Sequence, residues 1–257
     1  MSDFFNVNVN KGICIISLKR NPVNALSFDF LAELKNTFID LEKDNSLRVV
    51  IINSSTNHFS AGADLKERKI MSKNESCKAL DNFNECFNII ENFSKPTLCC
   101  IHGYCLGGGA ELASACDIRI GSKDCIIGFP EVSIGIIPGA GGTQRLPRII
   151  GLANAKYWIY TAKKFSGEDA FKYGFLTFLT SYQNLNNKAH EIALEIIANA
   201  PIAVTSSKTS ISNGYDEKIN DGLNIERKAY NIALNTVDRD EALQAFTEKR
   251  KPQWKNK

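Results

Sequence analysis

The sequence lacks any long apolar run and any large excess of charge of one sign. No stretch reaches the roughly 18 consecutive apolar residues of a membrane-spanning helix, so we predict no membrane contact. Thirty-one basic residues against 28 acidic ones give a formal net charge of +3. Because nucleic-acid binders concentrate basic residues on one face, we expect no nucleic-acid partner. The first residues have neither the basic nor the apolar part of a secretory signal, and we expect a cytoplasmic protein.

Paired cysteines are also missing, although the chain has eight cysteines. None follows residue 125, and no two have the C-x-x-C spacing of many zinc and redox sites. Most lie in apolar runs such as 97–101, so we expect small buried side chains in a reducing compartment. The three histidines, His58, His102 and His190, do not cluster with cysteine or aspartate at ligand spacing. The sequence therefore predicts no metal site.

The first part of the chain alternates strand-like and helix-like patterns. Such alternation predicts an α/β fold in which helices connect parallel strands. From residue 184 onward the pattern is helical, and we therefore expect an α/β core at 1–195 and a helical region at 196–257. We expect strands at 12–18, 49–52, 97–101, 118–120 and 125–129, and helices at 28–43, 77–93, 201–213, 218–235 and 238–250.

Three segments with glycine follow predicted strands and could carry chemistry. The first, at 59–67, reads Phe-Ser-Ala-Gly-Ala-Asp-Leu-Lys-Glu. Small residues let a ligand approach the backbone, and free N–H groups at a helix start can bind developing negative charge. The alternative is a turn into a helix that Asp64 and Glu67 cap as a pair.

The other two segments each contain a glutamate. Gly107, Gly108 and Gly109 precede Glu111, and glycines at a helix start leave the amides unshielded, as an oxyanion hole requires. A glutamate in the first helical turn can also simply complement the helix dipole. Glu131 follows the strand expected at 125–129, where it is either a catalytic group or an exposed side chain in a turn.

Six segments, in this order along the chain, resemble the crotonase (enoyl-CoA hydratase/isomerase) superfamily over about residues 7–254. They lie at 21–26, 60–66, 107–111, 130–132, 139–148 and 246–250. The resemblance implies the α/β crotonase (ClpP/crotonase) fold, a spiral of ββα units. It also implies that residues 1–195 hold the acyl-CoA site and that 196–257 form a helical trimerisation region, giving a trimer or a dimer of trimers.

The resemblance further assigns roles to single residues. Glu111 and Glu131 match the two catalytic glutamates, and the N–H groups of Ala63 and Gly108 match the oxyanion hole. No cofactor is expected beyond the coenzyme A of the substrate. The residues implied in binding the acyl-CoA are Ala61, Ala63, Asp64, Leu65, Lys66, Phe246 and Lys249. Of these, Phe246 and Lys249 would hold the adenine nucleotide of coenzyme A, either in their own subunit or in a neighbouring one.

These residue types suit the addition of water to a 2-trans-enoyl thioester. Two carboxyl groups can share one water, so that one activates it toward C3 and the other delivers a proton to C2. The two amides stabilise the enolate oxygen. Which glutamate holds the shared proton is a property of the coupled pair.

Several alternatives stay open at this point. An enoyl-CoA isomerase often relies on one carboxylate. Because this chain has a glutamate at both catalytic positions, Glu111 and Glu131, we favour a hydratase. Residues 129–132 and 249–252 also resemble the 3-methylglutaconyl-CoA hydratases, and Phe129 stands where many hydratases have glutamine. From another class, residues 103–107 match the nucleophile elbow of an α/β-hydrolase with Cys105 as nucleophile and His190 as its base. That interpretation leaves the other segments unexplained.

Overall fold

The computed structural model describes residues 2–257, and an α/β body with two sheets forms most of it. The strands are β1 (Phe5–Asn10), β2 (Ile13–Leu18), β3 (Val49–Ser54), β4 (Thr97–Ile101), β5 (Tyr104–Leu106), β6 (Ile118–Ser122), β7 (Ile126–Gly128), β8 (Lys164–Ser166) and β9 (Phe178–Thr180). The larger sheet has the order β1-β2-β3-β4-β6-β9, and the smaller one the order β5-β7-β8.

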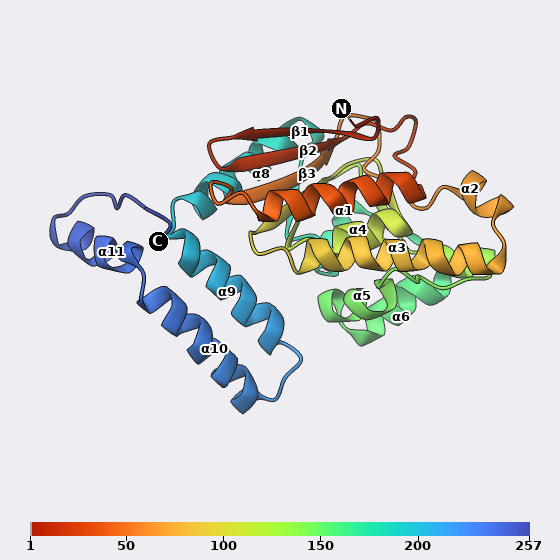
Figure 1. The fold of residues 1–257 in the computed structure, drawn as a ribbon. Coiled ribbons are helices and arrows are strands. Elements are labelled where there is room, and N and C mark those ends of the chain that lie inside the picture. Colours follow the sequence, from red (N-terminus) through yellow and green to blue (C-terminus); the bar gives the residue numbers. More distant parts are fainter. Residues whose placement is uncertain (1) are drawn as a thin grey trace.

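Helices connect the strands or follow the last of them (Figure 1). They are α1 (Phe28–Glu42), α2 (Leu65–Ile70), α3 (Lys73–Glu91), α4 (Gly108–Ser114), α5 (Gly142–Ile150), α6 (Leu152–Thr161), α7 (Gly167–Lys172), α8 (Leu185–Ile197), α9 (Pro201–Gly214), α10 (Ile219–Leu234) and α11 (Val237–Thr247), with the short 3-10 helices η1 (Glu131–Ile134) and η2 (Tyr182–Asn184). No helix among these residues is long and apolar enough to cross a membrane.

The strands from β2 to β9 in the larger sheet pair in parallel, as expected from the alternating pattern. β1 was not expected, because its valines alternate with asparagines and all but its first residue are exposed. It adds to the edge of the sheet antiparallel to β2. α3 begins at Lys73, earlier than expected, because Ser72 and Glu75 form a capping box at its start.

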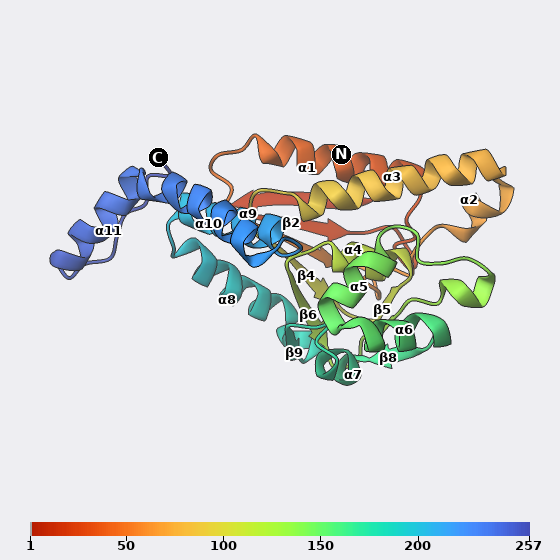
Figure 2. The ribbon, with the colours of Figure 1, turned by 90° about the horizontal axis from the view of Figure 1, so that it is seen from below.

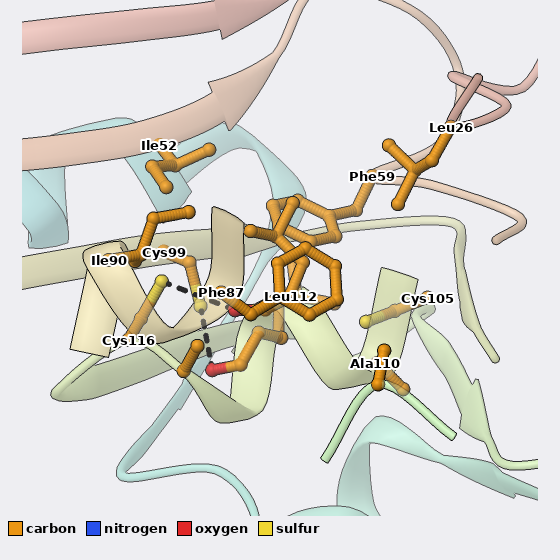
Figure 3. Packing of buried hydrophobic residues seen from close by; sticks show 14 of the residues in the cluster. Leu26, Ile52, Phe59, Phe87, Ile90, Cys99, Cys105, Ala110, Leu112 and Cys116 are labelled. Carbon is orange, nitrogen blue, oxygen red and sulfur yellow. Dashed lines mark hydrogen bonds between the residues drawn. The ribbon is translucent and has the colours of Figure 1, made fainter. Parts of the chain in front are cut away.

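Alternate side chains of the central strands pack on opposite layers of helices. Val49 and Ile51 face the cluster that includes α8, whereas Val50 and Ile52 face the main core under α1 and α3. Cysteines fill small spaces in that core: Cys99 and Cys116 pack beside Phe87 and Leu112 (Figure 3). All cysteines of residues 2–257 are buried except Cys77, which confirms the interpretation of most of them as small core side chains.

The chain repeatedly runs from the larger sheet to the smaller one and then into a helix. β4 leads to β5 and α4, and β6 leads to β7, η1 and α5. These ββα units are the spiral that the resemblance implied. They bring the end of β5, the start of α4 and the end of β7 together, because β5 pairs in parallel with β7.

Helices α9, α10 and α11 form an arm that projects from the body (Figures 1 and 2). α8 still packs on the larger sheet, so the boundary expected after residue 195 falls within α8, and the arm begins at Pro201. The arm carries many large apolar side chains that are exposed in one chain. Among them are Ile211, Ile219, Leu223, Tyr230, Ile232, Leu243 and Phe246.

Candidate active site

A cavity of about 740 Å³ opens beside the start of α4. α2, α3 and the segment from η1 to α5 surround it. Most of its wall is apolar, from side chains such as Leu80, Phe83 and Ile137, and its polar groups include Glu111 and Glu131. An apolar cleft with a few converging polar groups is the usual form of a small-molecule site.

Glu111 lies in the first turn of α4 and is only 4% exposed. Its Oε1 accepts hydrogen bonds from the backbone N–H groups of Ala140 at 2.8 Å and Gly142 at 2.9 Å. Burial raises the pKa of Glu111 above its usual value, although these two donors and the Arg145 guanidinium act in the opposite direction. Two hydrogen bonds to one oxygen therefore hold the carboxyl group in one orientation in the wall of the cavity.

Glu131 is the first residue of η1, just beyond the end of β7. It is 9% exposed, so the alternative of an exposed glutamate in a turn is wrong. Its Oε2 is buried and has no hydrogen-bond partner among the described residues. Burial and the nearby Glu111 raise the pKa of Glu131 to about 7. Such a group can both hold and release a proton near neutral pH.

The amides of Ala63 and Gly108 lie side by side at the same cavity. A Cβ built on Gly108 would be 3.4 Å from the Ala63 nitrogen, and one built on Gly62 would be 3.1 Å from the Gly108 nitrogen. Neither N–H donates a hydrogen bond within residues 2–257. Two free, adjacent amide donors can bind an oxygen on which negative charge develops.

Tertiary pairing places these two amides together. Ser60 forms a parallel bridge with Cys105 of β5, through the bonds Ser60 N–H to Tyr104 O at 2.9 Å and Leu106 N–H to Ser60 O at 3.0 Å. Gly62 then turns the chain at a φ of +96°, which favours glycine. A Cβ at Gly62 would also lie 2.7 Å from the Leu106 carbonyl oxygen, so the close approach requires glycine.

Only some of the residues that were expected to bind the acyl-CoA line the cavity. Ala63 and Leu65 line the cavity, whereas Ala61, Asp64 and Lys66 are not part of its wall. Asp64 caps α2 by accepting from the N–H groups of Lys66 and Glu67, and it pairs with Arg20 at 2.8 Å. Glu67 does not complete a capping pair; its carboxylate instead accepts from the N–H of Phe28 at 3.1 Å.

Phe246 and Lys249 do not lie near the cavity of their own chain. Both are exposed, with Phe246 84% exposed at the end of α11. α11 is at the opposite end of the molecule from α2 in both views (Figures 1 and 2). A role for these residues at the site stays a prediction, and it would require a neighbouring subunit.

The structure adds an arginine that the sequence did not single out. Arg68 of α2 lines the cavity and lies over the Phe83 ring, with Cζ 5.3 Å from the ring centroid. Its Nη1 is 3.5 Å from the Ser76 carbonyl oxygen, and no carboxylate pairs with it in the part of the chain that the structure describes. In the sequence, Arg68 lies in a Lys-Glu-Arg-Lys run and resembles the other solvated charges there. Only the tertiary packing shows that it lines the cavity.

Cys105 does not have the environment of a nucleophile. Its side chain is fully buried in the core, and burial raises the pKa of the thiol well above its usual value. A fully buried thiol cannot reach a substrate, and its raised pKa disfavours the thiolate that nucleophilic attack needs. The hydrolase interpretation is therefore wrong. Across residues 2–257, no three His, Cys, Asp or Glu side chains cluster as metal ligands would.

Comparisons with known proteins identify the family of this chain. The family model for enoyl-CoA hydratase/isomerase matches residues 8–257. The chain is 38% identical over 241 residues to a short-chain-enoyl-CoA hydratase of Clostridium acetobutylicum, covering 93% of this chain and 92% of that one. It is 38% identical over 252 residues to a mitochondrial methylglutaconyl-CoA hydratase of Mus musculus, covering 96% and 80%.

Comparison with a solved structure identifies the fold. The crystal structure of an enoyl-CoA hydratase from Bacillus anthracis superimposes with a TM-score of 0.97 at 40% identity, covering 99% of this chain and 100% of that one. The α/β crotonase fold implied by the sequence motifs is thereby confirmed. The chain belongs to the enoyl-CoA hydratase/isomerase family of the crotonase superfamily.

Proposed function

We propose that this member of the family is a carbon–oxygen lyase that reversibly adds water to a 2-trans-enoyl-CoA thioester, giving the 3-hydroxyacyl-CoA. The observation that carries this function is the pairing of two buried glutamates with two free amides at one apolar cavity. Isomerisation of the double bond needs a proton shuttle but no site for a reacting water. A pair of carboxyl groups that can share a water favours hydration.

The mechanism follows from the different environments of the two glutamates. The thioester oxygen accepts from the N–H groups of Ala63 and Gly108, which stabilise the enolate as it forms. Glu111, held by two amide donors, removes a proton from water as the water oxygen bonds to C3. Glu131, with a pKa near 7, delivers its proton to C2. The carboxyl pair ends with the same number of protons, since it gives one and takes one.

The test uses crotonyl-CoA and the purified full chain. Hydration removes the enoyl chromophore and incorporates one oxygen from ¹⁸O-labelled water at C3. Loss of the chromophore together with this incorporation supports the function. Interconversion of 2- and 3-enoyl-CoA with no labelled hydroxyl product would instead identify an isomerase.

A second candidate is a hydratase for a branched acyl chain that ends in a carboxylate. Arg68 favours it, because an unpaired guanidinium in an apolar cavity can bind a carboxylate through two parallel hydrogen bonds. Arg68→Met should then lower kcat/KM at least about tenfold for a glutaconyl-type substrate and little for crotonyl-CoA. The matched control is Lys69→Met, since Lys69 is exposed on the same helix and outside the cavity wall. Equal losses on both substrates would point to coenzyme A as the ligand of Arg68.

The remaining proposals concern the oligomeric state, location, pathway, cofactors and partners of the enzyme. We expect a trimer or dimer of trimers, supported by the apolar side chains exposed on the arm. Phe246 and Lys249 would then reach the coenzyme A of a neighbouring subunit. Cytoplasmic localisation, a role in fatty acid β-oxidation, the lack of any separate cofactor, and the lack of membrane or nucleic-acid partners are part of the same proposal. They rest on the sequence and on the proposed reaction.

A further inference from the structure

Arg145 connects the Glu111 site to helix α3. It lies on α5, is only 8% exposed, and its Nη1 donates to the carbonyl oxygen of Ala140 at 3.0 Å. Its Nη2 donates to Asn88 Oδ1 and to Glu91 Oε2, each at 2.7 Å. Ala140 is also one of the two residues whose N–H holds Glu111. Ala140 thus donates its N–H to Glu111 and accepts from Arg145 through its carbonyl oxygen.

The turn at 139–142 fits closely around this guanidinium. Gly141 has a φ of +98°, and a Cβ built on it would lie 1.9 Å from Nη1 of Arg145. The turn thus has no room for a side chain, and the guanidinium fills that space instead. Asn84 of α3 donates to the carbonyl oxygen of Gly139 at 3.2 Å, which fixes the turn from the same helix.

We propose that Arg145 is a positioning residue for Glu111 in the hydration proposed above, on which this inference rests. Its bond to Ala140 O orients the turn so that the N–H groups of Ala140 and Gly142 converge on one oxygen of Glu111. Its bonds to Asn88 and Glu91 fix the guanidinium on the rigid helix α3. The carboxylate is thereby held in place before substrate arrives, and misplacement of such a group by about 1 Å can cost about a hundredfold in rate.

A buried arginine could also serve stability alone, so the experiment must separate the two roles. Glu111 faces three charged groups from the elements around it: Glu131 after β7, Arg145 on α5 and Arg68 on α2. If Arg145 positions the carboxylate, its loss weakens the two amide bonds and removes a positive charge. Both effects raise the pKa of Glu111 and move the acidic limb of the pH–rate profile to higher pH.

The test compares Arg145→Gln and Arg145→Lys with the wild type on crotonyl-CoA, below the unfolding temperature of each variant. We expect kcat to fall about tenfold to a hundredfold in Arg145→Gln, with KM changed less than kcat. Lysine cannot reach Ala140 and Glu91 at once, so Arg145→Lys should recover only part of the rate. Added guanidinium ion should partly rescue Arg145→Gln. The control is Arg148→Gln, one turn further on α5, whose partner is Asp216 on the surface.

A second variant keeps the proposal testable if Arg145→Gln does not fold. Glu91→Gln leaves the arginine in place but weakens the contact that orients it, so it should give a smaller change of kcat and pH profile in the same direction. A lower Tm with unchanged kcat and pH profile in the variants would overturn the positioning role. If the wild type itself shows no hydration, the proposed function fails instead. Infrared titration of the Glu111 carboxyl then tests the positioning effect without any reaction, and an unshifted titration in Arg145→Gln would overturn it.

Discussion

Glu131 lies beside Glu111 in the same cavity, but the two carboxyl groups are held in opposite ways. Glu111 accepts two backbone hydrogen bonds, whereas Glu131 has a buried oxygen with no partner in the described chain. The charge of Glu111 also raises the pKa of Glu131, which reaches about 7. The two amide donors favour an ionised Glu111, whereas burial and the neighbouring charge of Glu111 favour a protonated Glu131.

The two glutamates should act as one unit. Glu111→Gln and Glu131→Gln should each lower the rate of hydration at least about a hundredfold, the scale expected of acid–base groups. The double variant should lose less than the product of the two single losses, because removal of either group already disables the pair. Steady-state kinetics with crotonyl-CoA measure this. Full activity in either single variant would exclude the two-carboxylate mechanism.

The raised pKa of Glu131 should also make the free energy of unfolding depend on pH. Below the pKa of the unfolded state both states hold the proton, and the buried neutral carboxyl is tolerated. As the pH rises toward about 7, the unfolded chain ionises first, so the folded state loses relative stability through this window. Glu131→Gln should therefore be more stable than the wild type at pH 8 and similar to it at pH 4. Urea unfolding at the two pH values measures the difference, and equal effects at both would contradict the raised pKa.

The proposed role of the Ala63 and Gly108 amides can be tested through Gly62. Gly62→Ala puts a Cβ 2.7 Å from Leu106 O at a φ of +96°, so the segment that carries the Ala63 amide must shift. Loss of one such donor costs about a hundredfold to a thousandfold in kcat, and a displaced donor should cost at least about tenfold. Gly135→Ala is the matched control, because Gly135 also has a positive φ but nothing lies within 4 Å of its Cβ. Equal kcat losses in the two variants would show that only backbone strain matters.

Two cysteines should respond in opposite ways to alkylation. Cys77 is exposed and lines the cavity, so an alkylating reagent should label it and inhibit the enzyme, and coenzyme A thioesters should protect it. Cys105 is fully buried with a raised pKa and should stay unlabelled. Cys77→Ser should abolish the inhibition, and Cys105→Ala should keep most activity. Mass spectrometry locates the label; labelling of Cys105 with loss of activity would contradict our assignment.

Assembly and coenzyme A binding should be linked through the arm. Lys249→Ala should raise KM for crotonyl-CoA and leave kcat largely intact, because it would remove a contact to the nucleotide and none to the reacting atoms. Mass measurement in dilute solution gives the oligomeric state. A fully active monomer of 28.5 kDa would refute the contribution of a neighbouring subunit.

The sequence by itself determined the parts of this protein that depend on local patterns. Apolar runs such as 49–52 and 97–101 became parallel strands, because strands buried on both faces are apolar along their whole length. The glycines before Glu111 became the start of α4, and Glu131 followed its strand as expected. The polar strand β1 escaped detection because an exposed edge strand needs no continuous apolar run.

Only the tertiary structure decided how the functional groups are held. The raised pKa of Glu131, the free amides of Ala63 and Gly108, and the contact of Arg145 with Ala140 all join segments far apart in the chain. No local periodicity reports such contacts, because they depend on the pairing of β5 with β7 and on the packing of α3 against the turn at 139–142. Desolvation and hydrogen bonding act through space, so the chemistry of these residues is fixed only when the sheets and helices meet.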